Sequence, residues 1–176
     1  MPAGVTYTTI ATTTLASNQG TVTFSSIPST YTDLVLVING GYVDNGFAFG
    51  IRVGNGSVDS GSNYSFTFLK GNGSVASSGR GSNFTLGLAT EQGINNLSNT
   101  AIVNFMNYSN TSVFKTWLAK GGSAGDNAGS TVSLWRSTSA INTIAISESG
   151  TGGSGSFNYG NMLAGSTFTL YGIAAA

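Results

Sequence analysis

The sequence contains neither cysteine nor histidine, and these two absences exclude most enzyme chemistries. Without cysteine the chain has no disulfide framework, no thiolate metal site and no cysteine nucleophile. Without histidine it lacks the commonest metal ligand and general base, so no Ser-His-Asp or Cys-His arrangement can form. We therefore expect a protein that is not an enzyme and that holds no cofactor and no metal.

Charged residues are scarce as well. Six basic and six acidic side chains cancel, and charged residues make up only 7% of the chain, against about 25% in ordinary domains. Nucleic acids and anionic lipids select for clustered lysine and arginine, so neither is an expected partner. A net charge of zero also removes the repulsion that keeps copies apart, which favours self-association or incorporation into an assembly.

Long apolar runs are the third absence. No stretch reaches the ~18 residues of a membrane span. The N-terminus, Met1 to Tyr7, has neither the basic start nor the apolar core of a signal peptide. We expect a chain that is neither secreted through a signal peptide nor embedded in a membrane.

Serine, threonine, asparagine and 26 glycines are abundant, which suits strands joined by tight turns better than helices. Apolar and polar residues alternate with a period of two, as they do when successive side chains point to opposite faces of a sheet. The segments with strand signals are Val22–Phe24, Leu34–Ile38, Phe47–Val53, Tyr64–Phe68, Phe84–Leu88, Ile102–Met106, Val113–Leu118, Val132–Trp135, Ile141–Ile146 and Phe168–Ile173. Roughly ten strands predict a single all-β domain, a jelly roll or two-sheet antiparallel β-sandwich, over residues 16–176.

Two segments support more specific expectations. The continuous apolar run Leu34–Ile38 ends in Asn-Gly-Gly and is typical of a strand covered on both faces, so we place it at the centre of the core. The pentapeptide Gly54–Val58 returns as Gly71–Val75, and its Asn-Gly pair tolerates the positive φ of a tight hairpin. We predict the same turn chemistry at both copies, with the next strands beginning at Asn63-Tyr64 and Asn83-Phe84.

A pair of carboxylates can hydrolyse a glycosidic bond without histidine. The candidate acids are Asp33, Asp44, Asp59, Glu91, Asp126 and Glu148. Asp44-Asn45-Gly46, Asp59-Ser60-Gly61 and Asp126-Asn127 are typical of turns in which aspartate bonds its own backbone, and we favour this structural role over catalysis. Calcium binding at the Asp44 and Asp126 loops is conceivable, but neither supplies the spaced acids of an EF-hand.

Aromatic side chains are the remaining candidates for a binding site. Tyr42, Trp117, Trp135, Tyr159 and Tyr171 could stack on sugar rings in a receptor-binding site. The alternative is that they fill the core. We favour the core for Trp117 and Trp135 because both lie within apolar strand patterns.

Five segments together carry a resemblance to a known family. They are Ser25–Val37 (SSIPSTYTDLVLV), Gly61–Ser65 (GSNYS), Asn104–Thr111 (NFMNYSNT), Ser133–Asn142 (SLWRSTSAIN) and Ala164–Ile173 (AGSTFTLYGI). The chain resembles small jelly-roll virion proteins of tailed bacteriophages, notably marine phages and cyanophages. Because such sequences occur both alone and as terminal modules of longer tail proteins, the resemblance implies a virion surface domain more firmly than a position on the particle.

The resemblance implies a capsid cement or decoration protein, since this chain stands alone and starts at methionine. Made in the host cytoplasm, copies would dock on the outer surface of the capsid as homotrimers and clamp neighbouring subunits of the major capsid protein. The alternative is a tail-fibre or tail-tip adhesin that binds a host glycan. Copy number separates the two, because many copies per particle fit the capsid and few fit the tail.

Residues 1–15 form an N-terminal segment of a different character. Val5 to Leu15 is Thr-rich, uncharged and without strong alternation, and such a stretch pairs with a neighbouring chain more readily than it builds a core. The candidate assembly arm consists of Val5, Thr6, Tyr7, Thr8, Thr9 and Ile10. We hypothesise that it anchors the protein to a capsid subunit or to its own trimer partner; an ordinary first strand of the same domain is an equally good interpretation.

Overall fold

The computed structural model describes residues 6–41, 48–89, 99–123, 125–150 and 157–174. These residues form strands and connecting turns and no helix, which confirms the all-β prediction. The strands are β1 (Tyr7–Thr14), β2 (Thr21–Phe24), β3 (Asp33–Gly40), β4 (Ala48–Asn55), β5 (Ser57–Val58), β6 (Tyr64–Gly71), β7 (Ala76–Phe84), β8 (Gly87–Leu88), β9 (Asn99–Met106), β10 (Lys115–Ser123), β11 (Ala128–Trp135), β12 (Thr143–Ser149) and β13 (Thr167–Ile173).

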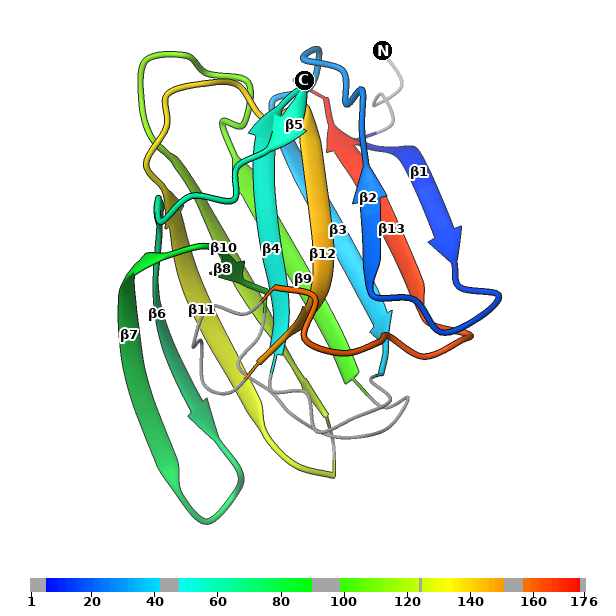
Figure 1. Cartoon of the computed structure of the whole chain (residues 1–176), viewed down its shortest axis with the longest axis vertical. Helices are drawn as coiled ribbons and strands as arrows, with labels where there is room; N and C mark the ends of the chain where they lie inside the picture. The colour runs from blue at the N-terminus through cyan, green and yellow to red at the C-terminus, as the bar shows by residue number, and fades with distance from the viewer. Residues whose placement is uncertain (1–5, 42–47, 90–98, 124, 151–156, 175–176) are drawn as a thin grey trace.

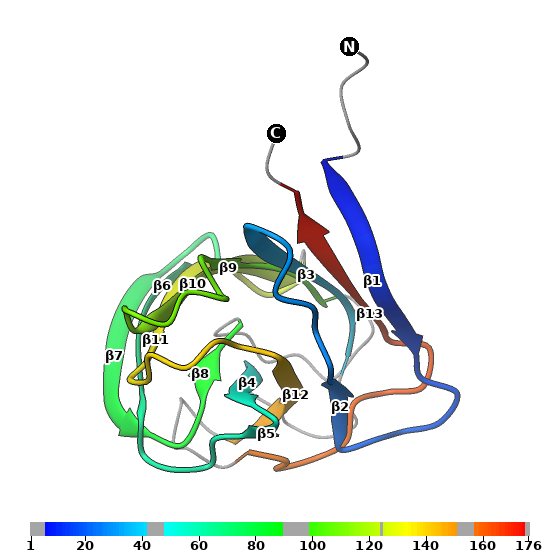
Figure 2. The same cartoon turned by 90° about the horizontal axis from the view of Figure 1, so that it is seen from above.

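The strands form two antiparallel sheets that pack as a jelly-roll β-sandwich (Figure 1). The larger sheet has eight strands in the order β1-β13-β3-β9-β10-β11-β6-β7. The smaller has the order β2-β12-β4-β5, and β8 also pairs with β4. Figure 2 shows the larger sheet curving around the smaller one. The predicted fold class is therefore confirmed.

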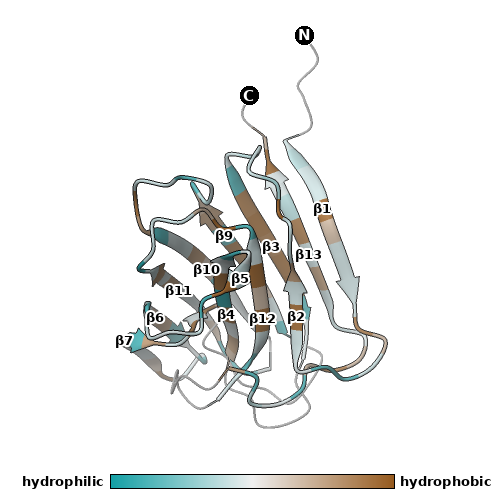
Figure 3. Cartoon of the chain, turned by 45° about the horizontal axis from the view of Figure 1, so that its top comes forward, coloured by the Kyte–Doolittle hydropathy of each residue, from teal (hydrophilic) through white to brown (hydrophobic). Residues whose placement is uncertain are grey.

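The core lies between the two sheets. Leu34, Leu36 and Ile38 on β3 are fully buried and belong to one cluster with Phe49 and Ile51 on β4. Figure 3 shows the hydrophobic colour concentrated on β3, β4 and β12, while β1 is mostly pale. The central place predicted for the β3 run is confirmed, although its far side is covered less completely than its inner side.

Both copies of the repeated pentapeptide form hairpin turns, as predicted. Gly56 joins β4 to β5 and Gly73 joins β6 to β7, each with a φ of +86°, a conformation that side chains other than glycine rarely adopt. After the second copy, however, the expectation of a strand beginning at Asn83-Phe84 was wrong. There the chain forms β7, and Phe84 ends that strand.

β7 escaped prediction because two of its inward positions are glycines, which leaves Phe84 at its end as its inward apolar side chain. Gly79 and Gly81 occupy inward positions, and the rings of Phe68 and Phe66 from the paired strand β6 cover them. A Cβ atom at Gly81 would lie 2.7 Å from the Phe66 ring and 2.3 Å from the ring of Phe84 at the end of β7. The rings of β6 thus take the place of the apolar side chains that would otherwise alternate along β7.

β10 begins at Lys115 and not at Val113. Val113 and Phe114 are about half exposed in the preceding loop, whereas the Lys115 side chain is 1% exposed at an inward position. Its Nζ donates hydrogen bonds to the carbonyls of Val113 (2.7 Å) and Thr138 (3.0 Å). Burial lowers the pKa of Lys115. The strand predicted over Val113–Leu118 is present but begins two residues later than expected, because Val113 and Phe114 belong to the loop and Lys115 takes the first inward position.

Candidate interaction surface

The described part of the chain includes Asp33, Asp59, Asp126 and Glu148, while Asp44 and Glu91 lie outside it. Asp59 and Asp126 occupy turns, as predicted. Asp59 Oδ1 accepts from the Gly61 amide at 2.7 Å, the backbone bond expected there, whereas Asp126 Oδ2 accepts from the side chain of Asn127 through Nδ2 at 2.9 Å. Glu148 is buried on β12. Over the described ranges, no three His, Cys, Asp or Glu side chains gather to hold a metal ion.

Asp59 accepts several hydrogen bonds from residues of its own loop and of neighbouring strands, and these bonds hold the fold together. Trp135 Nε1 and Asn63 Nδ2 each donate to Asp59 Oδ2 at 2.8 Å. The Tyr64 hydroxyl donates to the backbone carbonyl of Asp59 at 2.9 Å. Burial raises the pKa of Asp59, but the hydrogen bonds and the charge of Arg52 outweigh burial and hold that pKa below its ordinary value. The charged carboxylate fastens the loop after β5 to β11.

The tryptophans lie where predicted, and the tyrosines do not form one platform. Trp117 is fully buried and Trp135 is 4% exposed. Tyr159 is 58% exposed and bonds through its amide to β12 of the smaller sheet. Tyr171 lies on the larger sheet, edge-on to Tyr7 with ring centroids 6.2 Å apart. Tyr42 lies outside the described residues.

The outer face of the larger sheet, which is turned away from the smaller sheet, carries exposed apolar side chains on four adjacent strands. They are Leu69 on β6 (64% exposed), Ile102 and Met106 on β9 (40% and 44%), Leu118 on β10 (38%) and Val132 on β11 (51%). We call these five residues the apolar patch. Leu118 and Val132 are direct cross-strand partners at its centre. Ile102, Met106, Leu118 and Val132 lie within segments predicted as strands and Leu69 directly follows one, but the outward orientation of these side chains was not predicted.

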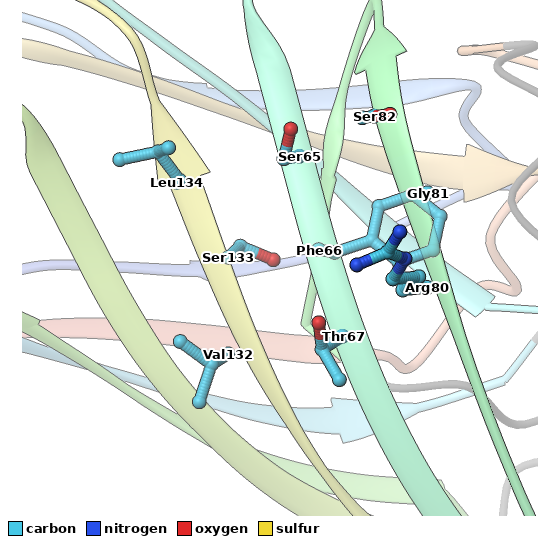
Figure 4. A pocket seen from close by; sticks show the side chains of 9 residues that line it. All are labelled: Ser65, Phe66, Thr67, Arg80, Gly81, Ser82, Val132, Ser133 and Leu134. Carbon is cyan, nitrogen blue, oxygen red and sulfur yellow. The ribbon is translucent and has the colours of Figure 1, made fainter.

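A groove of about 360 Å³ runs over β11, β6 and β7 on this face. Figure 4 shows Val132 and Leu134 on β11 along one side and Arg80 on β7 along the other, with Ser65 and Thr67 on β6 between them. Nothing in the described part of the chain bonds to the Arg80 side chain. Arg80 was not among the predicted site residues, because β7 was not predicted as a strand.

The candidate arm residues lie in β1, the outermost strand at one edge of the larger sheet (Figure 1), and just before it. Val5 is outside the described residues, and the Thr6 carbonyl accepts from the Ala174 amide at 3.2 Å. Tyr7, Thr8 and Thr9 pair with Ile173, Gly172 and Tyr171 of β13, and the register shifts at Ile10. The segment therefore pairs with its own chain on one side, and among the described strands its other side has no partner.

No protein-family model matches the chain, and no curated protein matches it. Solved structures similar to it include the galectin LEC-6 of Caenorhabditis elegans (TM-score 0.35, 10% identity, covering 93% of this chain and 96% of the galectin). A human SPRY domain gives a TM-score of 0.33 at 13% identity over 94% of this chain and 96% of the domain. A toad ovary galectin in complex with thio-digalactose gives 0.29 at 13% identity over 72% and 98%. Likenesses this distant say nothing about what the chain binds.

No helix among the described residues is long and apolar enough to cross a membrane.

Proposed function

We propose that this chain is a non-catalytic structural protein of a tailed-phage virion, specifically a capsid cement or decoration protein. The observation that carries the proposal is the apolar patch on the outer face of the larger sheet. At its centre the exposed side chains of Leu118 and Val132 pair directly across β10 and β11, and exposed apolar side chains gathered on one face favour contact with another protein. The resemblance of five sequence segments to phage virion proteins supplies the setting.

The mechanism is burial of this face against the major capsid protein on the outside of the shell. Leu118 and Val132 lie at the centre of the patch and would be the most completely covered. Burying apolar surface contributes roughly 25 cal/mol per Å² before the costs of association. Ion pairs contribute little, because only 7% of the residues are charged.

Strand edges offer a second kind of contact. The free side of β1 presents backbone donors and acceptors that a strand from another chain can bond. We propose that this edge joins neighbouring copies in a homotrimer or pairs with a capsid subunit.

A tail-tip adhesin is the second candidate, and the groove beside Arg80 favours it. Its volume of about 360 Å³ is at the lower end of small-ligand sites, and Ser65, Thr67 and Ser82 bring hydroxyl groups to it. A host glycan would bond such groups.

Two measurements test the proposal. Quantitative mass spectrometry of purified particles should find many copies per virion, whereas few copies would support the adhesin. Binding to capsid shells should fall roughly tenfold or more in Leu118→Glu, because a carboxylate at the centre of the patch must lose its hydration on docking. Val75→Glu is the matched control, since Val75 is 65% exposed in the β6–β7 turn, outside the patch. Equal shell binding by Leu118→Glu and the wild type would contradict the proposal.

A further inference from the structure

The groove over β11, β6 and β7 combines three features that together define a ligand. Val132 and Leu134 give it an apolar side, Arg80 gives it a cationic side, and Ser65, Thr67 and Ser82 bring hydroxyl groups. All of these outward side chains come from three neighbouring antiparallel strands. The arrangement is therefore fixed by the sheet and does not depend on a loop.

The charge on this half of the face has one sign. β10, β11, β6 and β7 contain no aspartate or glutamate, and Arg80 and Lys120 are their exposed cations. Among the described acids, Asp33 bonds the Asn107 amide, Asp59 bonds Trp135, and Asp126 bonds its neighbour Asn127. In a chain of zero net charge, Arg80 is left beside the groove without a carboxylate partner among the described residues.

The size and shape of the groove favour an extended peptide. Side chains two residues apart on a strand are about 6.6 Å apart, which is the spacing of Val132 and Leu134 on β11 and of Ser65 and Thr67 on β6. An extended segment lying along the strands repeats at the same distance. Nucleic acid is disfavoured, because it would need several clustered cations.

We propose that this groove binds an extended segment of a partner protein in which a carboxylate side chain pairs with Arg80 and an apolar side chain packs on Val132 and Leu134. Guanidinium and carboxylate groups form two parallel hydrogen bonds, which fix the register of the segment. The inference rests on the proposed function in taking the outer face as the docking surface, and it adds the chemistry of the partner: an acidic and apolar strand.

The experiment uses the full chain and a fluorescent peptide of alternating valine and glutamate, with binding followed by anisotropy. The wild type should bind this peptide and not its valine–lysine counterpart. Arg80→Glu should weaken binding at least tenfold, and Arg80→Lys should weaken it less, because lysine keeps the charge but loses the fork. Lys120→Glu is the control, since it changes net charge equally on the same face but outside the groove.

If Arg80→Glu and Lys120→Glu weaken peptide binding equally, the proposal is overturned, because the loss would then depend on net charge and not on the position of Arg80 in the groove. Absence of peptide binding, or tighter binding of a polyuronate than of the peptide, would also overturn it. Shell binding is measured in parallel with the same variants. If shells bind and Arg80→Glu leaves that binding unchanged, the groove inference fails and the cement proposal stands. If the peptide binds at Arg80 but shells do not bind, the cement proposal fails alone.

Discussion

At the scale of single residues, the packing around Trp117 leaves no room for one more methyl group. Gly87 on β8 lies against the indole, and a Cβ atom there would be 2.2 Å from Trp117 Cζ2 and 3.0 Å from the Ser133 Cβ. The ring cannot move aside easily, because Trp117 is fully buried and its Nε1 donates to the Leu88 carbonyl at 2.9 Å. Glycine at this position is thus a packing requirement and not a turn requirement.

Gly87→Ala is therefore expected to lower the free energy of unfolding by about 1–3 kcal/mol, the usual cost of overpacking a filled core. The melting temperature should fall by several degrees. Gly125→Ala is the matched control, because a Cβ there meets nothing within 4 Å. Thermal unfolding followed by circular dichroism compares the two, and equal melting temperatures would contradict this account of Gly87.

At the scale of elements, most strands could be predicted from the sequence because the apolar side chains that cover their inner face belong to the same strand. β3, β9 and β13 each place apolar residues at every second position toward the core, and all three were predictable. β7 was not, because Gly79 and Gly81 occupy inward positions and are covered by the Phe68 and Phe66 rings of β6 together with Phe84 at the end of β7. Strand detection fails where the apolar cover of one strand is encoded in another.

The loop after β5 depends on the charged form of Asp59. The pKa of Asp59 is lowered in the folded protein, so its charge adds stability above the unfolded pKa of about 3.9. That contribution is lost as the pH falls through the lower folded pKa. Asp59→Asn should therefore be less stable than the wild type at neutral pH, by about 1–2 kcal/mol for weakened hydrogen bonds, and the difference should shrink in acid.

Urea unfolding from neutral pH to below pH 3 measures this difference. Asp126→Asn serves as the control, since the Asp126 side chain accepts from its neighbour Asn127 and does not join the loop to a core tryptophan. A gap between wild type and Asp59→Asn that stays constant across the whole pH range would show that the charge of Asp59 is not what stabilises the loop.

At the scale of the whole molecule, composition and alternation together predicted the architecture but not the surface. The abundance of Gly, Ser, Thr and Asn indicated strands and tight turns, and roughly ten alternating segments predicted an antiparallel sandwich. Which apolar residues face outward depends on strand register and on where the smaller sheet ends, and neither is visible in one sequence. Leu118 and Val132 look like core residues until the sheet places them on its open side.

β1 is buried so little that it should contribute little to the stability of the fold. Five of its eight residues are exposed, and Ile10 and Ala11 are its residues that pack partly against the core cluster. Deleting residues 2–12 should therefore leave a folded sandwich with β13 at its edge. If β1 serves assembly, the truncated protein should keep its β-sheet circular dichroism spectrum and lose trimerisation or shell binding.

A point variant separates the free side of β1 from the side that pairs with β13. The Thr6 carbonyl accepts from the amide of Ala174, which directly follows β13. Hydrogen-bonded positions alternate along an antiparallel pair, so the Thr9 amide faces the free edge. Thr9→Pro removes this outward donor and blocks strand addition, whereas Thr8→Pro removes a hydrogen bond between β1 and β13. We expect Thr9→Pro to fold normally and to lose assembly, measured by analytical ultracentrifugation and shell co-sedimentation. Normal decoration of shells by both Thr9→Pro and the truncated protein would rule out the arm, and failure of the truncated protein to fold would identify β1 as an ordinary first strand.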